Sequence, residues 1–222
     1  MKTLFIPAYS QKKISKSQIL QLSKKLPKTL AIAYSIQFKN LAKEIKNILS
    51  RNHKINSFVH KNSLSKNHRI TSFAQVLGCS QPKFPQNTDA VLLVSSGKFH
   101  AVSLASEIQI PVYLFAGNTL EKISDNEIQK IKQKQKASYL KFLNADEVGV
   151  LVSTKPGQQN LKKAIEFKKN LKNKKSYLFV ANNINASEFE NFGLKSWINT
   201  SCRRMDMNDS SIINLENLNI RD

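Results

Sequence analysis

Three short runs of apolar residues limit the possible folds of this chain most strongly. Leu30–Ser35 (LAIAYS), Ala90–Val94 (AVLLV) and Val148–Val152 (VGVLV) are apolar at nearly every position, without a polar residue at each second place. A strand that is buried on both faces has this pattern, which is typical of parallel sheets covered by helices. Segments with helical spacing follow these runs, so the rhythm predicts strand–helix–strand units.

The same alternation extends over the whole chain. We expect strands at Thr3–Ala8, Leu30–Ser35, Ile55–His60, Ala90–Val94, Pro111–Phe115, Val148–Val152, Tyr177–Val180 and Trp197–Thr200, and helices at Ser17–Leu26, Phe38–Leu49, Phe99–Ile108, Asn126–Leu143, Gln158–Leu171 and Ser187–Phe192. A helix-opening pair, Ser124-Asp125, follows the end of the first set of strands and places a boundary near 120. The sequence therefore predicts an α/β protein of two tandem small domains, 1–120 and 121–222, each a mainly parallel sheet flanked by helices.

Composition restricts the compartment and the class of partner. Only two cysteines occur in 222 residues, so a disulfide framework is not expected and a reducing cytoplasm is the default. We expect no signal peptide and no membrane span, because no apolar stretch approaches the ~20 residues that a span needs. The formal net charge of +20 would suit an acidic partner such as nucleic acid. However, the lysines are scattered and no basic–aromatic platform accompanies them, so a solvated surface is favoured over nucleic-acid binding.

Four segments lie where functional residues are expected in a parallel α/β sheet, beyond the carboxyl ends of strands. They are Leu77–Ser80, Ser95–His100, Ser153–Gln158 and Thr200–Arg204. Small residues in the second and third would let the backbone approach a ligand, and N–H groups at a helix start favour a carboxylate or phosphate. Such turns are common in α/β proteins, so position alone leaves a purely structural role open.

The cysteines and the histidine are equally open to two interpretations. A lone cysteine is often a small buried apolar residue, and the separation of Cys79 from Cys202 excludes a C-x-x-C metal site. Arg203 and Arg204 directly follow Cys202 and would favour its thiolate, which is the form that binds metals or attacks as a nucleophile. His100, at the start of an apolar helix, could equally have a local structural role.

Five stretches of the chain, taken in order, carry a family likeness. They are LAIAYSIQ (Leu30–Gln37), QVLGCS (Gln75–Ser80), SSGKFH (Ser95–His100), VGVLVSTKPGQ (Val148–Gln158) and WINTSCRRMDMND (Trp197–Asp209). In this order they resemble the archaeal-type diphthamide synthases, the 2-(3-amino-3-carboxypropyl)histidine synthase family, and IINLENL (Ile212–Leu218) resembles the closing segment of that family. The likeness covers nearly the whole chain and makes both cysteines expected metal ligands.

The resemblance implies an iron–sulfur transferase that uses S-adenosylmethionine. In the family, three similar α/β domains each give one cysteine to a [4Fe-4S] cluster, whose fourth iron site binds S-adenosylmethionine. An electron from the cluster cleaves the S–Cγ bond, and the 3-amino-3-carboxypropyl radical adds to a histidine ring carbon of translation elongation factor 2. Cys79 and Cys202 match the second and third cluster cysteines. The residues that match the cofactor-binding loops are Gly97, Lys98, Phe99, His100, Thr154, Lys155, Gly157 and Gln158.

The chain also departs from the family pattern. It begins where the second family domain begins, no third cysteine is present, and Arg203 stands where the family usually has proline. We therefore expect one part of a split enzyme, in which a separate chain supplies the missing N-terminal domain and the third cysteine in a homo- or hetero-oligomer. The alternatives are a non-catalytic or degenerate relative with a structural or electron-relay role, and a basic nucleic-acid-binding module.

Overall fold

The computed structural model describes residues 6, 8–61, 68–71, 73–76, 82–207 and 209–218. Two compact units make up the chain, Met1–Ile128 and Gln129–Asp222, which are called unit 1 and unit 2 below. The division falls within helix α4 (Asp125–Asn144), later than the predicted boundary at 120/121. Most of the strand predicted at Thr3–Ala8, and all of Leu77–Ser80 with Cys79, lie outside the described residues.

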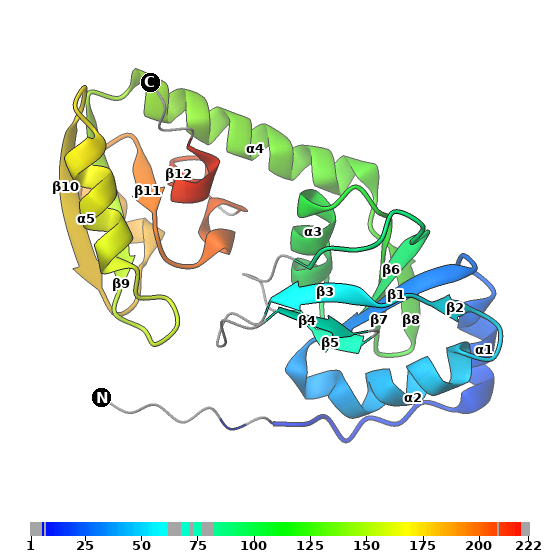
Figure 1. Cartoon of the computed structure of the whole chain (residues 1–222). Coiled ribbons are helices and arrows are strands. Elements are labelled where there is room, and N and C mark those ends of the chain that lie inside the picture. The colour runs from blue at the N-terminus through cyan, green and yellow to red at the C-terminus, as the bar shows by residue number, and fades with distance from the viewer. Residues whose placement is uncertain are drawn as a thin grey trace. The chain divides into compact units, whose positions relative to one another are not determined.

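Unit 1 contains a mainly parallel sheet and a separate hairpin (Figure 1). Its helices are α1 (Lys16–Ser23), η1 (Ile36–Phe38), α2 (Lys39–Leu49) and α3 (Lys98–Glu107), followed by the start of α4. Its strands are β1 (Thr29–Tyr34), β2 (Lys54–Ile55), β3 (Phe58–Lys61), β4 (His68–Thr71), β5 (Phe73–Gln75), β6 (Ala90–Val94), β7 (Val112–Ala116) and β8 (Thr119–Lys122). The sheet order is β2-β1-β6-β7-β8, and β5 also pairs with β1.

Several parts of unit 1 differ from the sequence prediction, and strands β4 and β5 lie where no strand was expected. The single strand predicted at Ile55–His60 is two strands, because β2 pairs with β1 whereas β3 pairs with β4 in the antiparallel hairpin. Strand β8 was not predicted, and it runs antiparallel to β7 after a turn at Gly117, whose φ is +65°. A positive φ is readily reached only by glycine, so this turn returns the chain directly onto its own sheet.

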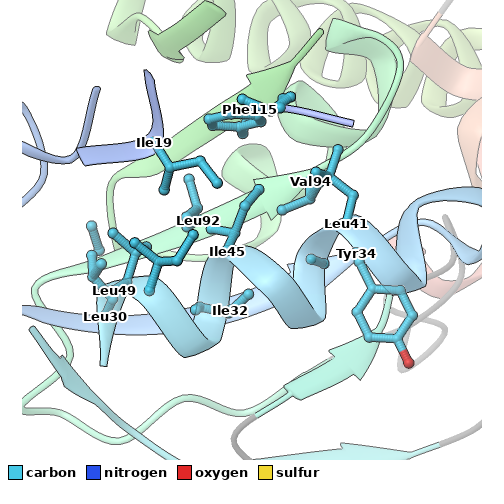
Figure 2. Packing of buried hydrophobic residues seen from close by; sticks show 14 residues of the cluster. Ile19, Leu30, Ile32, Tyr34, Leu41, Ile45, Leu49, Leu92, Val94 and Phe115 are labelled. Atoms are coloured by element: carbon cyan, nitrogen blue, oxygen red, sulfur yellow. The ribbon is translucent and has the colours of Figure 1, made fainter. Parts of the chain in front are cut away.

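The core of unit 1 lies on both faces of the sheet, as the continuous apolar runs predicted. Leu30 and Ile32 of β1 pack in one cluster with α2, while Ala31 and Ala33 pack in the other with α3. Figure 2 shows the first cluster, in which Ile45 of α2 lies over the strands. Alternate residues of a strand point to opposite faces, so β1 must be apolar throughout to bury both.

Unit 2 contains a second sheet in which every pairing of the described strands is parallel. Its helices are the remainder of α4, α5 (Leu161–Asn170), η2 (Ala186–Phe192), η3 (Arg203–Met207) and η4 (Leu215–Asn217). Its strands are β9 (Glu147–Ser153), β10 (Lys175–Ala181), β11 (Trp197–Asn199) and β12 (Ile212–Asn214). The sheet order is β10-β9-β11-β12. The predicted fold class, two α/β modules with mainly parallel sheets, is thereby confirmed.

A glycine in the middle of β9 makes room for a large aromatic residue. A Cβ at Gly149 would lie 2.2 Å from Cε3 of Trp197. Trp197 is fully buried and stacks on Phe189 with ring centroids 4.2 Å apart. The ring is therefore closely packed by both residues, and position 149 can hold no side chain larger than hydrogen without repacking.

Helix α5 begins at Leu161, later than the Gln158 start predicted from its spacing. The intervening residues form a turn, in which the N–H of Gln158 donates to the carbonyl oxygen of Lys155 (3.0 Å). Pro156 and Gly157 are its central residues, and Gly157 has φ +80°. Proline followed by a glycine with positive φ is the signature of a type II turn. Within the described part of the chain, no helix is long and apolar enough to cross a membrane.

Candidate functional site

Two of the four predicted segments come together at the carboxyl edge of the unit 2 sheet. The N–H of Ser153, at the end of β9, donates to Oγ of Ser201 in the loop after β11 (2.8 Å). Asn160, just before α5, donates through Nδ2 to the carbonyl oxygen of Thr200 (2.7 Å). The hydroxyl of Thr200 donates in turn to the carbonyl oxygen of Leu151 (2.7 Å). The loops after β9 and β11 therefore form one hydrogen-bonded edge, as their place after parallel strands predicted.

Cys202 lies in this edge as a half-buried thiol outside any disulfide. Its carbonyl oxygen accepts from Nδ2 of Asn199 (2.7 Å) and from the N–H of Met205 (3.1 Å). Nδ2 of Asn199 also donates to Oδ1 of Asn214 (2.6 Å), and Oδ1 of Asn199 accepts from the N–H of Ser201 (2.9 Å). Both asparagines are buried at strand ends. The backbone at Cys202 is thus held by a buried amide pair, which the sequence analysis missed.

The two arginines after Cys202 have different environments. Arg203 forms an ion pair with Glu216 of η4, and its carbonyl oxygen accepts from Nδ2 of Asn214. Arg204 is buried, with 8% of its surface exposed. The expectation that both cations act on the Cys202 thiol therefore needs correction for Arg203, because a carboxylate beside a guanidinium offsets its charge.

Asp206 is a second residue that the sequence analysis missed. It is 1% exposed in η3, and its Oδ2 accepts from Nε2 of Gln135 in α4 (3.1 Å) and from Nδ2 of Asn217 in η4 (3.3 Å). Burial raises the pKa of this carboxyl to about 6, while hydrogen bonds from Gln135 and Asn214 act in the opposite direction. The side chain joins η3, which directly follows Cys202, to α4 and η4. No sequence pattern marked it, since a single acidic residue in a polar segment has no periodic signal.

The predicted cofactor-binding residues of unit 2 lie in the turn after β9. Thr154 is exposed, and its hydroxyl donates to Oδ1 of Asn182 (3.3 Å). The N–H of Lys155 donates to Oγ of Ser153 (3.1 Å). Gly157 and Gln158 complete the type II turn described above. Ser153, which bonds to Ser201 in the Cys202 loop, connects this turn to the cysteine.

The predicted cofactor-binding residues of unit 1 lie at the start of α3. Gly97 precedes the helix with φ −163° and open space around its Cβ direction, so the fold itself does not require glycine there. Lys98 forms ion pairs with Glu121 and with Glu127, the second at 3.6 Å. Phe99 is exposed and His100 is half-buried, with their ring centroids 6.0 Å apart.

The described chain before Cys79 ends at the same carboxyl edge of the unit 1 sheet. The N–H of Val76, directly after β5, donates to the carbonyl oxygen of Tyr34 (2.9 Å). The N–H of Ser35 donates to the carbonyl oxygen of Val94 (3.0 Å), at the strand end from which Ser95 continues to α3. Val76, the last described residue before Cys79, therefore lies at the edge that also presents Ser95–His100. The place of Cys79 itself lies outside the described residues.

The fit of these residues to an iron–sulfur cluster can be tested on Cys202. Thiolates from separate segments hold such clusters, and Cys202 offers one free, half-buried thiol on a fixed backbone. In the described part of the chain, no group of three or more His, Cys, Asp or Glu side chains could hold a metal ion. Cys202 thus fits the role of one ligand, and a complete ligand set needs thiolates from elsewhere.

The fold is that of an α/β protein with two mainly parallel sheets, in which the loop after β11 carries the free thiol of Cys202. Residues 1–212 match the family model described as "Putative diphthamide synthesis protein", and the chain belongs to this family. The resemblance inferred from the five sequence stretches is thereby confirmed.

Two curated relatives carry the name 2-(3-amino-3-carboxypropyl)histidine synthase. The protein of Pyrococcus horikoshii is 27% identical over 213 residues, which cover 93% of this chain and 60% of the relative. The protein of Methanocaldococcus jannaschii is 29% identical over 170 residues, which cover 71% of this chain and 42% of the relative. The chain therefore spans less than two thirds of the length of either relative.

Two solved structures of Dph2 from Pyrococcus horikoshii share the fold. One matches with a TM-score of 0.76 and 23% identity, covering 94% of this chain and 62% of that chain. The other, described as containing a 4Fe-4S cluster, matches with a TM-score of 0.75 and 22% identity over the same shares. At this level of identity the likeness establishes the α/β architecture.

Proposed function

We propose that this chain is a component of the enzyme for the first step of diphthamide biosynthesis. The reaction transfers a 3-amino-3-carboxypropyl group from S-adenosylmethionine to a histidine of translation elongation factor 2. The observation that carries this proposal is the half-buried thiol of Cys202, held by Asn199 at the carboxyl edge of a parallel sheet. The names of the curated relatives support the transferase class.

In this proposal Cys79 and Cys202 are ligands of a [4Fe-4S] cluster. A third thiolate comes from outside the 222 residues, which contain only these two cysteines, and we assign it to a separate chain carrying an N-terminal domain. When bound, the cluster supplies the electron that cleaves the S–Cγ bond of S-adenosylmethionine. The relative whose structure is described with a 4Fe-4S cluster supports this cofactor.

The chain's own residues would then hold the cysteine and orient the substrate. The buried pair of Asn199 and Asn214 limits movement of the Cys202 backbone. We assign S-adenosylmethionine binding to two loops, Gly97–His100 and Thr154–Gln158. Helix α3 begins at Lys98 in the first of these loops, and main-chain N–H groups at a helix start can donate to a carboxylate such as that of the methionine moiety.

The proposed partners follow from the same reaction. Elongation factor 2 would be the protein substrate, and the chain would work in a homo- or hetero-oligomer with the source of the third thiolate. We place this assembly in the cytoplasm, because free cysteines that are to bind a cluster need a reducing compartment.

Anaerobic reconstitution with iron and sulfide, followed by EPR of the reduced sample, tests the proposal. We expect a [4Fe-4S] signal only when an N-terminal-domain chain is present, and a shifted signal after S-adenosylmethionine is added. Cys79→Ser and Cys202→Ser should each abolish the signal, whereas the exposed-site control Ser187→Ala should keep it. A full signal from the Cys202→Ser variant would contradict the assignment.

A non-catalytic relative is the second candidate, and one contact favours it. Arg203 stands at the position where the family usually has proline, and it forms an ion pair with Glu216. Such a chain would have a structural or electron-relay role. Cells that carry the double variant Cys79→Ser/Cys202→Ser and retain normal diphthamide levels would support this reading over the first.

A further inference from the structure

The two edges of the unit 2 sheet differ in how well they are covered. Strand β12 forms one edge and is buried at every residue. Strand β10 forms the other edge, visible on the outer side of that sheet in Figure 1, and pairs only with β9 among the described strands. It is seven residues long, and Val180 within it is 54% exposed. Long exposed apolar edges are rare in stable proteins unless another strand covers them.

The main-chain groups on the open side of β10 can be identified from its register. The N–H of Lys175 donates to Asp146 (2.9 Å), and the carbonyl oxygen of Ala181 accepts from Thr154 (3.0 Å), so both residues face β9. Main-chain groups of a strand alternate in direction with a period of two. The intervening even-numbered residues, Ser176, Leu178 and Val180, therefore direct their N–H and C=O groups away from β9.

Exposed apolar side chains surround this open edge. Tyr177 and Val180 are exposed on the strand itself, and Phe192, which contacts Phe179 of β10 with ring centroids 4.7 Å apart, is exposed as well. Leu161 and Ile165 are exposed on α5, the helix that packs on β9 and β10. Half of the large exposed apolar residues in the described part of the chain thus lie on β10 and its neighbours.

The charge around the edge indicates the chemistry of its partner. Between 161 and 175 the chain has seven lysines and one carboxylate, Glu166. Lysines 162, 163, 168, 169 and 172 are exposed on α5 and in the loop that leads to β10. A second copy of this chain would bring an equally basic surface against it, which is unfavourable at short range. An acidic segment would be attracted to the same lysines.

We propose that the open edge of β10 binds an acidic protein segment, which adds to the sheet as a further strand. The main-chain groups of Ser176, Leu178 and Val180 supply the hydrogen bonds, the exposed apolar side chains supply apolar contacts, and the lysines of α5 select for negative charge. RNA would satisfy the lysines but has no amide backbone to pair with the strand edge. This inference does not depend on the proposed transferase function.

Fluorescence anisotropy with labelled peptides of about ten residues tests the proposal on the full chain. The probe alternates Glu with Val and Ile, and the matched probes replace Glu by Gln or by Lys, or carry N-methylated amides. We expect the acidic probe to bind at least about tenfold more tightly than each of the others. Equal affinity for the acidic and Lys probes, or no binding of the acidic probe, would overturn the proposal.

Two pairs of variants separate the contribution of the β10 main chain to peptide binding from that of the lysine charges. Val180→Pro removes an outward N–H at an exposed edge position and should weaken the acidic probe about tenfold, whereas Val180→Thr keeps the N–H and should weaken it less. Lys162→Glu/Lys163→Glu should also weaken it, but Lys24→Glu/Lys25→Glu, with the same change in net charge, should not. Circular dichroism checks the folding of each variant. A loss of binding in a variant that is still folded supports binding of the peptide at the edge of β10.

Two alternative occupants give distinct results that would overturn the proposal. If a second copy covers the edge, sedimentation will show a dimer that Val180→Pro dissociates, and the acidic probe will compete poorly with it. If RNA is the ligand, a labelled oligouridine will lose affinity with Lys162→Glu/Lys163→Glu but keep it with Val180→Pro.

Discussion

At the described carboxyl ends of the strands, main-chain hydrogen bonds join the loops in both units, and in unit 2 buried side chains add further bonds. Ser35 and Ser95 of unit 1 use their backbone N–H groups to reach neighbouring strands. In unit 2, Asn199 and Thr200 use their side chains. A main-chain contact survives most substitutions, but a buried amide contact is lost with its side chain and leaves an unsatisfied partner. We therefore expect the edge of unit 2 to be much more sensitive to substitution.

The largest effect should come from Gly149→Ala in unit 2. The new Cβ would lie 2.2 Å from the ring of Trp197, which also stacks on Phe189. Overpacking of this kind should lower the free energy of unfolding by about 3 kcal/mol. Trp197 is the only tryptophan in the sequence, so its fluorescence during urea unfolding reports on unit 2 directly. An unchanged unfolding midpoint would show that the ring can move aside.

The next effect concerns pH and the buried carboxyl of Asp206. Its folded pKa of about 6 lies above the ordinary value of 3.8, so the fold favours the protonated form. The contribution of the protonated carboxyl to the free energy of unfolding is fully present at low pH. It is lost as pH rises from about 4 through 6, a loss of about 3 kcal/mol. Asp206→Asn has no proton to lose, so the free energy of unfolding should change less with pH between about 4 and 6. The variant should be more stable than wild type at pH 7.5.

Urea unfolding at a series of pH values measures this difference. Other charged groups from the surrounding elements are Lys134 of α4, Arg203 and Arg204 of η3, and Glu216 of η4, which all remain in the variant. Glu166→Gln, at an exposed carboxyl, serves as the control and should keep the wild-type slope. An Asp206→Asn profile parallel to wild type would exclude Asp206 as the source.

A somewhat smaller effect is expected from Asn199→Ala. The substitution removes the donor to Cys202 and Asn214 and the acceptor for Ser201, which should cost about 2 kcal/mol. In a Cys79→Ser background, the freed loop should also let iodoacetamide alkylate Cys202 faster. Asn183→Ala, at an exposed asparagine, is the matched control. Equal alkylation rates in the Cys79→Ser protein with and without Asn199→Ala would mean that the amide pair does not restrain Cys202.

The smallest effect should come from Gly97→Ala in unit 1. The backbone there is extended and a Cβ meets nothing within 4 Å. We expect a change within about 0.5 kcal/mol, because surface substitutions away from special contacts rarely do more. Thermal unfolding followed by circular dichroism tests this. A large loss would remove the contrast between the two glycines and, with it, the comparison between the units.

The strands were predictable where burial forced a continuous apolar pattern. Leu30–Ser35, Ala90–Val94 and Val148–Val152 were recognised because a strand covered on both faces leaves no place for polar residues. Strands β8 and β12 were missed, since β8 is partly exposed and short, and β12 has only three residues. Pattern methods need longer segments than these.

The site was predictable by position but not by its supporting contacts. The rule that loops follow the carboxyl ends of parallel strands placed Ser153 and Thr200 correctly. The partners Asn160, Asn214 and Gln135 come from distant parts of the sequence and have no spacing that a single chain reveals. They become neighbours only through the topology of the sheet.

Helix α4 has a consequence for how the chain can be divided experimentally. Its first turn belongs to unit 1, where Ile128 packs against the core cluster that contains the buried Ile123, and its later turns carry Gln135 of unit 2. A fragment cut at 120, where the sequence alone suggested a boundary, would remove both isoleucines from the core they complete. A fragment that starts after 128 would instead begin within a helix, without its capping residues. Each half therefore needs an overlapping copy of the same helical turns, and expression of the halves as non-overlapping pieces should yield poorly folded protein.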